Sequence, residues 1–203
     1  METLPHFTPK LIVGVGSLLL TLVATWATMR TAGYPDHRAV PSWPKLLVGR
    51  LRRELPRGDL LTGAWLALAL WSVLVSGLHF GGVYYNVYTA RPWWDLMTHA
   101  MGGFGVAALL ALTFRRSTLR SPTWLVPAVL AVGAGFEVYE FVFKTFWYHW
   151  SLEFYVEDTI VDLILNTTGA AAFTALALLY RSRADTRSSD ADRGDDPLGT
   201  DSD

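Results

Sequence analysis

The sequence predicts an all-α, polytopic membrane protein with five transmembrane helices. Of its 203 residues, 51% are hydrophobic and 17% are charged. The apolar residues gather in five runs of about 20 residues, the length that a helix needs to cross the hydrocarbon core of a bilayer. The acidic residues avoid long apolar runs and accumulate near the carboxyl end of the chain. This composition is typical of a membrane-embedded chain and not of a soluble globular protein.

The five predicted helices cover residues 11–29, 60–82, 94–114, 123–143 and 159–180. The first run follows Lys10 and has features of a secretory signal sequence, but it is longer than a usual signal core and Arg30 follows it directly. We therefore expect it to be retained as a helix. Residues 1–181 then form one five-helix membrane domain.

The distribution of Lys and Arg predicts how these helices are oriented in the cell membrane. Three segments are rich in cations, whereas the alternate segments carry only Lys10, Arg91 and Lys144. The cations of the rich segments are Arg30, Arg38, Lys45, Arg50, Arg52, Arg53, Arg57, Arg115, Arg116, Arg120, Arg181 and Arg183. Because these segments are expected to face the cytoplasm, the amino terminus is predicted outside and the carboxyl terminus inside.

Two segments lie outside the predicted helices. Residues 44–55, "PKLLVGRLRREL", place Leu47, Val48, Leu51 and Leu55 on one helical face and cations on the other. This pattern is typical of a helix at the cytoplasmic interface among anionic headgroups, although a plain basic loop that fixes the topology explains it equally well. Residues 182–203 are rich in aspartate and almost free of apolar side chains, so they are predicted to form a disordered acidic cytoplasmic tail. Membrane lipids are the expected partners, and no nucleic acid is expected.

The predicted outer halves of the last three helices share a set of ionisable residues. Their spacing is i, i+4 in the third helix, i, i+3 in the fourth, and i, i+4 in the fifth, where Asn166 continues the same face. One face of each helix can therefore point to a common centre. The residues are Asp95, His99, Glu137, Glu140, Asp158, Asp162 and Asn166, and His79 near the outer end of the second helix is a further candidate.

Simpler roles are open for some of these residues. Asp95 and Asp158 lie where an acid caps a helix amino terminus, and Glu140 can reach water at the interface. Several aromatic residues of the outer segments are most simply an interfacial belt. They are Tyr84, Tyr85, Trp93, Trp94, Trp147, Tyr148 and Trp150.

The energetics of burial favour a bound ligand or protons at the shared centre. An isolated carboxylate at the centre of a bilayer costs about 2.5–3.5 kcal/mol on insertion scales, and several carboxylates repel one another. Oxygen ligands with one imidazole suit Mg, Mn or Zn, and the absence of cysteine excludes a thiolate site. The predicted metal ligands are Asp95, His99, Asp158 and Asp162, with Glu137 and Glu140 as general acid or base, and Asn166 and His79 as further polar members.

Three motifs in these helices resemble a known family. "DLMTH", "FEVYE" and "EDTIVDLILNTTGA" are similar in order and spacing to the VanZ-like membrane proteins and the related YjdF-like group, over roughly residues 93–172. The resemblance implies that the signature is carried by Asp95, His99, Glu137, Asp162, Asn166 and Gly169. Leu96 and Glu140 depart from the VanZ-like pattern and look closer to the YjdF-like group. VanZ-like proteins are associated with cell-envelope traits and glycopeptide resistance.

Three functions are compatible with these residues. The leading hypothesis is a metal-dependent enzyme that acts on a lipid headgroup or a lipid-linked envelope intermediate. The second is a proton- or cation-coupled carrier. The cytoplasmic halves of helices three to five have few polar residues beyond Thr113 and Thr174 to continue a transport path, which argues against it. The third is a scaffold or sensor in which the polar centre is structural.

Overall fold

The computed structural model describes residues 4–91 and 93–194, and every regular element in this part of the chain is a helix. Five segments are long and apolar enough to cross a membrane, which confirms the predicted all-α, multi-pass membrane protein. They are Pro9–Arg30, Leu60–Tyr84, Trp93–Thr113, Pro122–Phe143 and Leu152–Arg183.

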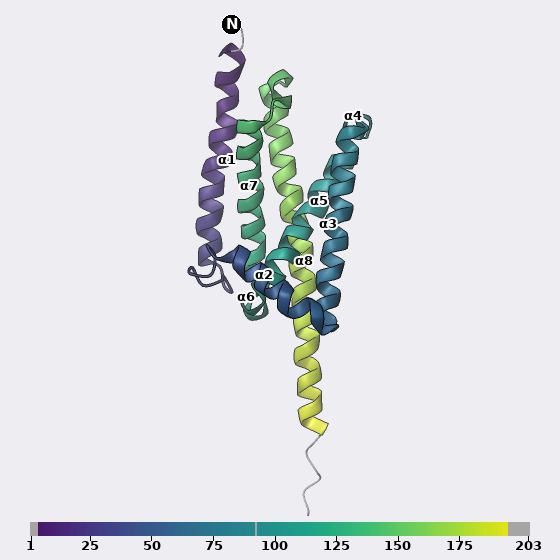
Figure 1. Cartoon of the computed structure of the whole chain (residues 1–203). Coiled ribbons are helices and arrows are strands. Elements are labelled where there is room, and N and C mark those ends of the chain that lie inside the picture. The colour runs from purple at the N-terminus through teal and green to yellow at the C-terminus, as the bar shows by residue number, and fades with distance from the viewer. Residues whose placement is uncertain (1–3, 92, 195–203) are drawn as a thin grey trace, which may run out of the picture.

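The transmembrane segments belong to five long helices, which form an elongated bundle (Figure 1). These are α1 (Leu4–Arg30), α3 (Leu60–Tyr84), α5 (Trp93–Thr113), α7 (Leu125–Phe143) and α8 (Leu152–Gly194). The shorter elements are α2 (Trp43–Glu54), η1 (Leu55–Arg57), α4 (Val87–Ala90), α6 (Arg115–Arg120), η2 (Pro122–Trp124) and η3 (Phe146–His149).

The two ends of the bundle differ in charge. We call the end that carries the start of α1 and α4 the site end, and the end that carries α2 and α6 the arginine-rich end (Figure 1). Two of the segments predicted to be cytoplasmic thus lie at one end. The predicted orientation in the membrane, with the amino terminus outside, stays a prediction.

α8 is longer than the sequence indicates at both ends. It begins at Leu152 and continues through Ser182 to Gly194, where disorder is the sequence-based expectation. Extending an existing helix avoids the unfavourable nucleation step, and no Gly or Pro interrupts residues 182–193. Residues 195–203 lie outside the described part of the chain, so the predicted disorder of the tail stays a prediction there.

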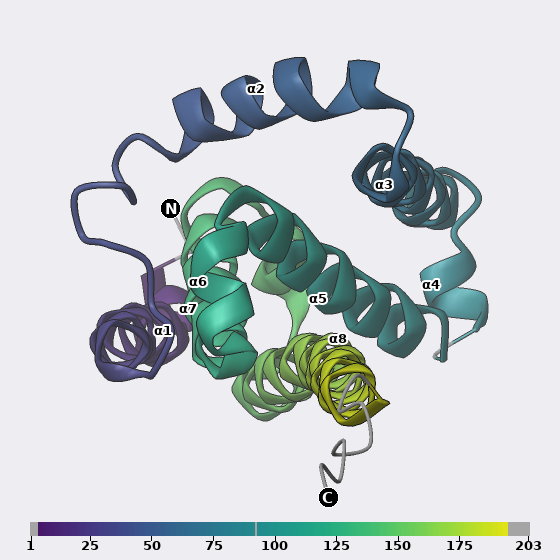
Figure 2. The same cartoon turned by 90° about the horizontal axis from the view of Figure 1, so that it is seen from below.

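The backbones of α5 and α8 touch where the two helices cross, and we call this place the α5–α8 crossing. A Cβ at Gly103 would overlap the backbone carbonyl of Asn166, and a Cβ at Gly169 would overlap the carbonyl of Ala100. Figure 2 shows α5 running obliquely across the bundle beside α8. Glycine at these two positions therefore lets the backbones touch, as small residues commonly do between membrane helices.

α1 packs along α7 and is fixed at the site end by a buried cation. Lys10 is only 4% exposed. Its ammonium group donates hydrogen bonds to the carbonyls of Trp147, at 2.9 Å, and Tyr148, at 2.8 Å. The Trp147 ring is fully buried between Phe141 and Tyr155 and stacks on both. The assignment of Trp147 to an interfacial belt is therefore wrong, because its ring and carbonyl belong to the core.

Other aromatic residues of that set remain at the surface of the site end. Tyr84, Tyr85 and Trp93 are 81%, 75% and 54% exposed. Tyr84 ends α3 and Tyr85 follows it; α3 packs mainly on α5 and leaves most of its apolar surface uncovered by protein. The exposure of these three aromatic residues is compatible with the predicted belt at the level of the lipid headgroups.

At the arginine-rich end, α2 runs along one side of the bundle between α1 and α3 (Figure 2), so the segment is a helix and not a plain loop. Leu47 and Leu51 of its apolar face pack on the buried cluster of Trp65, Leu68 and Ala108. Val48 and Leu55 of the same predicted face are 46% and 40% exposed. The apolar face is thus shared between the bundle and the surroundings.

One buried acid attaches α2 to α3. Glu54 is 4% exposed, forms an ion pair with Arg50 at 3.0 Å, and accepts a hydrogen bond from the Trp65 indole at 2.7 Å. Thr62 donates to the Glu54 carbonyl at 2.6 Å. Burial alone would raise the pKa of Glu54, but the Trp65 and Arg50 hydrogen bonds and the charges of Arg50 and Arg115 lower it below its ordinary value of 4.5.

The α5–α8 crossing predicts different effects for two similar substitutions. Gly103→Ala should lower the free energy of unfolding by about 1–3 kcal/mol, because the added methyl group meets backbone that cannot move alone. Gly77→Ala on α3 is the control, since a Cβ there has no atom within 4 Å, and it should be neutral or stabilising. Equal stability of the two variants in reversible unfolding from detergent micelles would contradict this account of the crossing.

The Glu54 contacts predict a local loss of structure in a second variant. Glu54→Ala leaves the Trp65 donor unpaired, which costs about 1–3 kcal/mol, so hydrogen exchange should accelerate along α2 while the exposed-site control Arg52→Ala changes little. Because the folded pKa is lowered, the stabilisation by ionised Glu54 is complete above pH 4.5 and is lost as the pH falls through the lower folded value. If hydrogen exchange in α2 changes neither in Glu54→Ala nor when the pH falls below 4.5, Glu54 does not attach α2 to α3.

Candidate functional site

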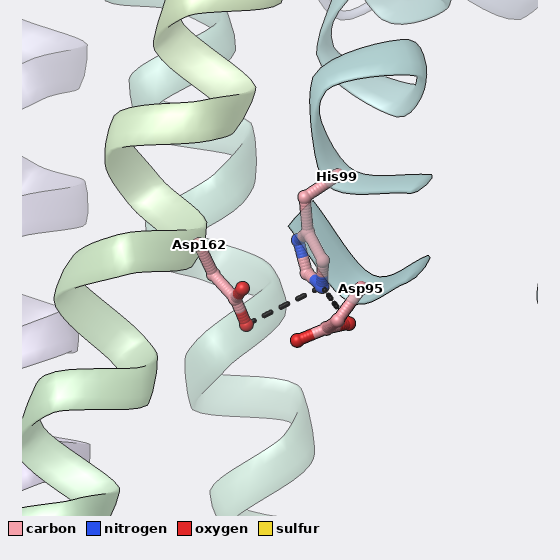
Figure 3. Close-up of side chains that lie close together, drawn as sticks. All are labelled: Asp95, His99 and Asp162. Atoms are coloured by element: carbon pink, nitrogen blue, oxygen red, sulfur yellow. Dashed lines mark ion pairs between the residues drawn. The ribbon is translucent and has the colours of Figure 1, made fainter. Parts of the chain in front are cut away.

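Three of the predicted metal ligands meet near the site end of the bundle. Asp95 and His99 lie on the first two turns of α5, and Asp162 lies on α8. We call these three residues the His–Asp cluster (Figure 3). The Nε2 atom of His99 is 3.3 Å from Asp95 Oδ1 and 3.3 Å from Asp162 Oδ2. One potential ligand atom from each residue lies within 4.8 Å of the others.

The local sequence explains why these side chains converge. Asp95 and His99 are four residues apart, so they share one face of α5. His99 lies one helical turn before Gly103, and Asp162 lies one turn before Asn166, the residue that contacts Gly103. Both side chains are therefore one turn away from the Gly103–Asn166 contact of the α5–α8 crossing, on its site-end side.

Burial increases across the cluster from α5 to α8. The side chains of Asp95, His99 and Asp162 are 31%, 18% and 6% exposed. The Asp162 Oδ1 atom is buried and has no hydrogen-bond partner among the described residues. A buried carboxylate oxygen without a donor is unfavourable, so the site has capacity for a proton, a water molecule or a cation.

The distances within the cluster are compatible with three ligands of one ion. A strong hydrogen bond between an imidazole N–H and a carboxylate is about 2.7–2.9 Å long, and the two contacts of 3.3 Å are at the long end of the hydrogen-bond range. Ligands placed tetrahedrally around an ion, at about 2.1 Å from it, lie about 3.4 Å apart. Two carboxylates and one imidazole are a donor set that Zn, Mn or Mg accepts.

Asn166 contacts the other nitrogen of the His99 ring. Its amide group lies 3.4 Å from His99 Nδ1. The same amide occupies a space beside Gly102 and Gly133, where a Cβ would lie 3.8 Å from its oxygen and 3.5 Å from its nitrogen. The predicted polar residue Asn166 therefore contacts the cluster through the imidazole.

The structure does not bring the remaining predicted acids into the His–Asp cluster. Glu137 is 2% exposed, accepts a hydrogen bond from Thr159 at 3.0 Å, and has its second carboxylate oxygen buried without a partner among the described residues. Glu140 and Asp158 are half-buried. Because α5 and α8 separate with distance from their crossing, Asp158, one turn further out than Asp162, is not among the grouped ligands.

His79 joins a separate hydrogen-bonded chain. Its Nδ1 lies 2.8 Å from the Tyr88 hydroxyl, which lies 3.4 Å from the hydroxyl of Thr98. Thr98 in turn donates to the backbone carbonyl of Asp95 at 3.0 Å. Burial, followed by the charge of Asp95, raises the pKa of Tyr88 above its ordinary value of 10.0, so the phenol stays protonated. His79 thus supports the start of α5 and does not contact the His–Asp cluster.

Sequence reasoning missed three residues around the site. They are Thr159, which holds Glu137, and Tyr88 and Thr98, which link α4 to α5. Thr159 follows Tyr155 by four residues and precedes Asp162 by three, so its helical spacing was the available signal. Tyr88 carried none, because its partners come from other helices.

An apolar layer separates the cluster from the arginine-rich end. Ala107, Val129 and Ala170 are buried together, and Val106, Leu110 and Phe173 pack against them. These residues come from α5, α7 and α8, the helices that also carry the ionisable residues. The polar centre is therefore nearer to the site end, and the layer bounds it on the opposite side.

Comparisons with known proteins identify the family of the chain. No curated protein and no solved structure matches it. Residues 55–183 match a family described as "Predicted membrane protein (DUF2238)". The match covers more than half of the chain and includes the whole His–Asp cluster with α3, α5 and α7. The chain therefore belongs to the DUF2238 family of predicted membrane proteins.

Proposed function

We propose that the His–Asp cluster binds a divalent cation and that the protein is a metal-dependent enzyme acting on a lipid headgroup or a lipid-linked envelope intermediate. The observation that carries the proposal is the pair of 3.3 Å distances from one nitrogen, His99 Nε2, to two carboxylates on different helices. This separation matches the spacing of ligands that share one ion, and it is also within the range of a long hydrogen bond.

The burial gradient supports a substrate that arrives from the site end. Asp162 is buried, whereas Asp95 is about one-third exposed, so a cation between them keeps an accessible side. A bound cation would polarise a phosphoryl or carbonyl oxygen as a Lewis acid. Lipid headgroups offer phosphate oxygens at this level of a membrane, beside the exposed Tyr84, Tyr85 and Trp93.

Glu140 is our candidate for general acid and base in this enzyme. It lies on α7 nearer to the site end than Glu137 and is half-buried, whereas Glu137 is fully enclosed and bonded to Thr159. In hydrolysis of a phosphate ester, the oxygen of water forms a bond to phosphorus and the bond to the leaving oxygen breaks. A carboxylate that takes the proton from the water returns it to that leaving oxygen.

The similarity of the motifs to VanZ-like and YjdF-like proteins supports a role in the cell envelope. Asp95, His99 and Asp162, which that resemblance singles out, are the residues that form the cluster. Fold and motif similarity do not by themselves fix the reaction. The chemistry is therefore argued from the cluster.

The apolar layer disfavours the carrier. A transported ion would have to pass the buried contacts among Ala107, Val129 and Ala170. A structural cation site is the second candidate, because the ligands come from two helices and an ion between them would hold α5 to α8. In that case, loss of the ion would lower stability as well as any activity.

Metal content is the first test of the proposal. The purified protein should contain a near-stoichiometric divalent metal by mass spectrometry, after reloading with Mg, Mn or Zn and mild dialysis. His99→Ala and Asp162→Asn should lose it, because each removes one ligand. Asp158→Asn is the matched control on α8 and should retain it. A wild-type protein that holds no metal, or a loss that is equal in all three variants, would refute the cation site.

A second substitution separates the enzyme from the structural site. Glu140→Gln should lower the hydrolysis of a lipid-linked phosphate substrate by about 10²–10⁴-fold, as loss of a general acid or base typically does. Its metal content and melting temperature should match those of the wild type. If substrate panels show no turnover while Asp162→Asn and metal removal lower the melting temperature alike, the structural site is the better description.

A further inference from the structure

The free face of α2 carries an apolar stripe beside a cationic stripe. Val48 and Leu55, which directly follows α2 with helical backbone angles, are seven residues apart and therefore lie along one line of the helix. They are 46% and 40% exposed. Lys45 and Arg52 are also seven residues apart and exposed, and each is three or four residues from Val48, so the two stripes are neighbours.

The opposite face of α2 is occupied by the bundle. Leu47 and Leu51 pack on the cluster that contains Trp65, and Glu54 accepts a hydrogen bond from the Trp65 indole. Arg50 forms the ion pair with Glu54 at 3.0 Å. Arg50 is thus a structural cation, and the stripe of Lys45 and Arg52 is the part of α2 that can bind an external group.

The described part of the protein does not neutralise the cationic stripe. Neither Lys45 nor Arg52 has an ion-pair partner within it. Apart from Glu54, the acids of residues 31–59 are engaged by backbone: Asp36 accepts from the N–H of Arg38 at 2.9 Å, and Asp59 caps α3. At the same end, α6 adds the exposed cations Arg115, Arg116 and Arg120. This surface therefore has an excess of positive charge.

The position of α2 in the chain favours a lipid surface as the partner. The first span ends at Arg30 and the second begins at Leu60, so the chain enters the membrane on both sides of α2 and holds this helix at the edge of the bilayer. An acidic protein segment would pair with the cations but would offer nothing apolar to Val48 and Leu55. A bilayer of anionic lipids offers phosphate groups and acyl chains together.

We propose that the free face of α2 binds the headgroups of anionic phospholipids at the arginine-rich end of the bundle. Lys45 and Arg52 contact the phosphates, and Val48 and Leu55 insert at the boundary between headgroups and acyl chains. This surface lies at the opposite end from the His–Asp cluster and does not depend on the proposed function.

A lipid titration of the full chain tests the cationic stripe. The sequence has no cysteine, and a Cβ at Gly49 would have no atom within 4 Å, so Gly49→Cys accepts a single environment-sensitive fluorophore on α2. Phosphatidylglycerol added to non-ionic detergent micelles should change its emission with a saturable midpoint, whereas phosphatidylcholine should not. Lys45→Gln/Arg52→Gln should raise this midpoint by about 5–25-fold, because each cation near an anionic surface contributes about fivefold.

The matched control is Arg91→Gln/Lys144→Gln, which removes two cations from the site end and should leave the midpoint unchanged. The proposal is overturned if phosphatidylcholine acts as phosphatidylglycerol does, or if Lys45→Gln/Arg52→Gln keeps the midpoint of the parent protein. None of these readouts requires a metal or turnover, so the proposed function can fail without affecting them.

A depth measurement tests the apolar stripe. In bilayers that contain phosphatidylglycerol, a spin label at Val48→Cys should be relaxed by oxygen and protected from a water-soluble nickel chelate, and a label at Gly49→Cys should show the reverse. Equal access of the chelate to both labels would exclude insertion of Val48. If Asp185→Asn/Asp190→Asn/Asp192→Asn removes the protection at position 48, the acidic tail covers this face and the lipid proposal is wrong.

Discussion

At the α5–α8 crossing, Gly103 and Gly169 bring two backbones into contact, and the geometry of the polar centre follows from that contact. A helical turn rises about 5.4 Å, so side chains one turn away from a crossing still reach one another, while those further out separate. His99 and Asp162 are at that distance, and Asp158 is beyond it. The crossing also holds Asn166 beside the imidazole. A change in the helix angle would therefore alter both nitrogen contacts of His99 together.

Much of the fold and part of the site could be predicted from local sequence. Five apolar runs define the five spans, because length and hydropathy are properties of each run alone. The pairing of Asp95 with His99 follows from helical spacing, and its approach to Asp162 follows from similar depth on neighbouring helices. Spacing does not give the angle between helices, so it could not separate Asp162 from Asp158. It also could not show that Glu137 is enclosed with Thr159.

The features that the sequence did not reveal are pairs formed between distant segments. From the sequence, Lys10 looks like a surface cation beside the first span. In the structure it donates to the carbonyls of Trp147 and Tyr148, which are more than a hundred residues away along the chain. Glu54 looks like one more charge in a basic segment, yet it is buried between Arg50 and Trp65. In each case a partner from another element helps to stabilise the buried charge: the two carbonyls for Lys10, and the Trp65 indole, in addition to the local Arg50, for Glu54.

The apolar layer of Ala107, Val129 and Ala170 also bears on how the membrane potential acts on the protein. When a unit charge crosses a whole membrane at a potential of 100 mV, its electrostatic free energy changes by about 2.3 kcal/mol. His99 lies six residues into α5, roughly 9 Å along its axis, and the layer lies beyond it. If the cluster binds a cation that enters and leaves by the site end, as we propose, that cation would experience only the shallow part of the electric field. Occupancy of the cluster would follow ion concentration on one side of the membrane and would be nearly independent of voltage.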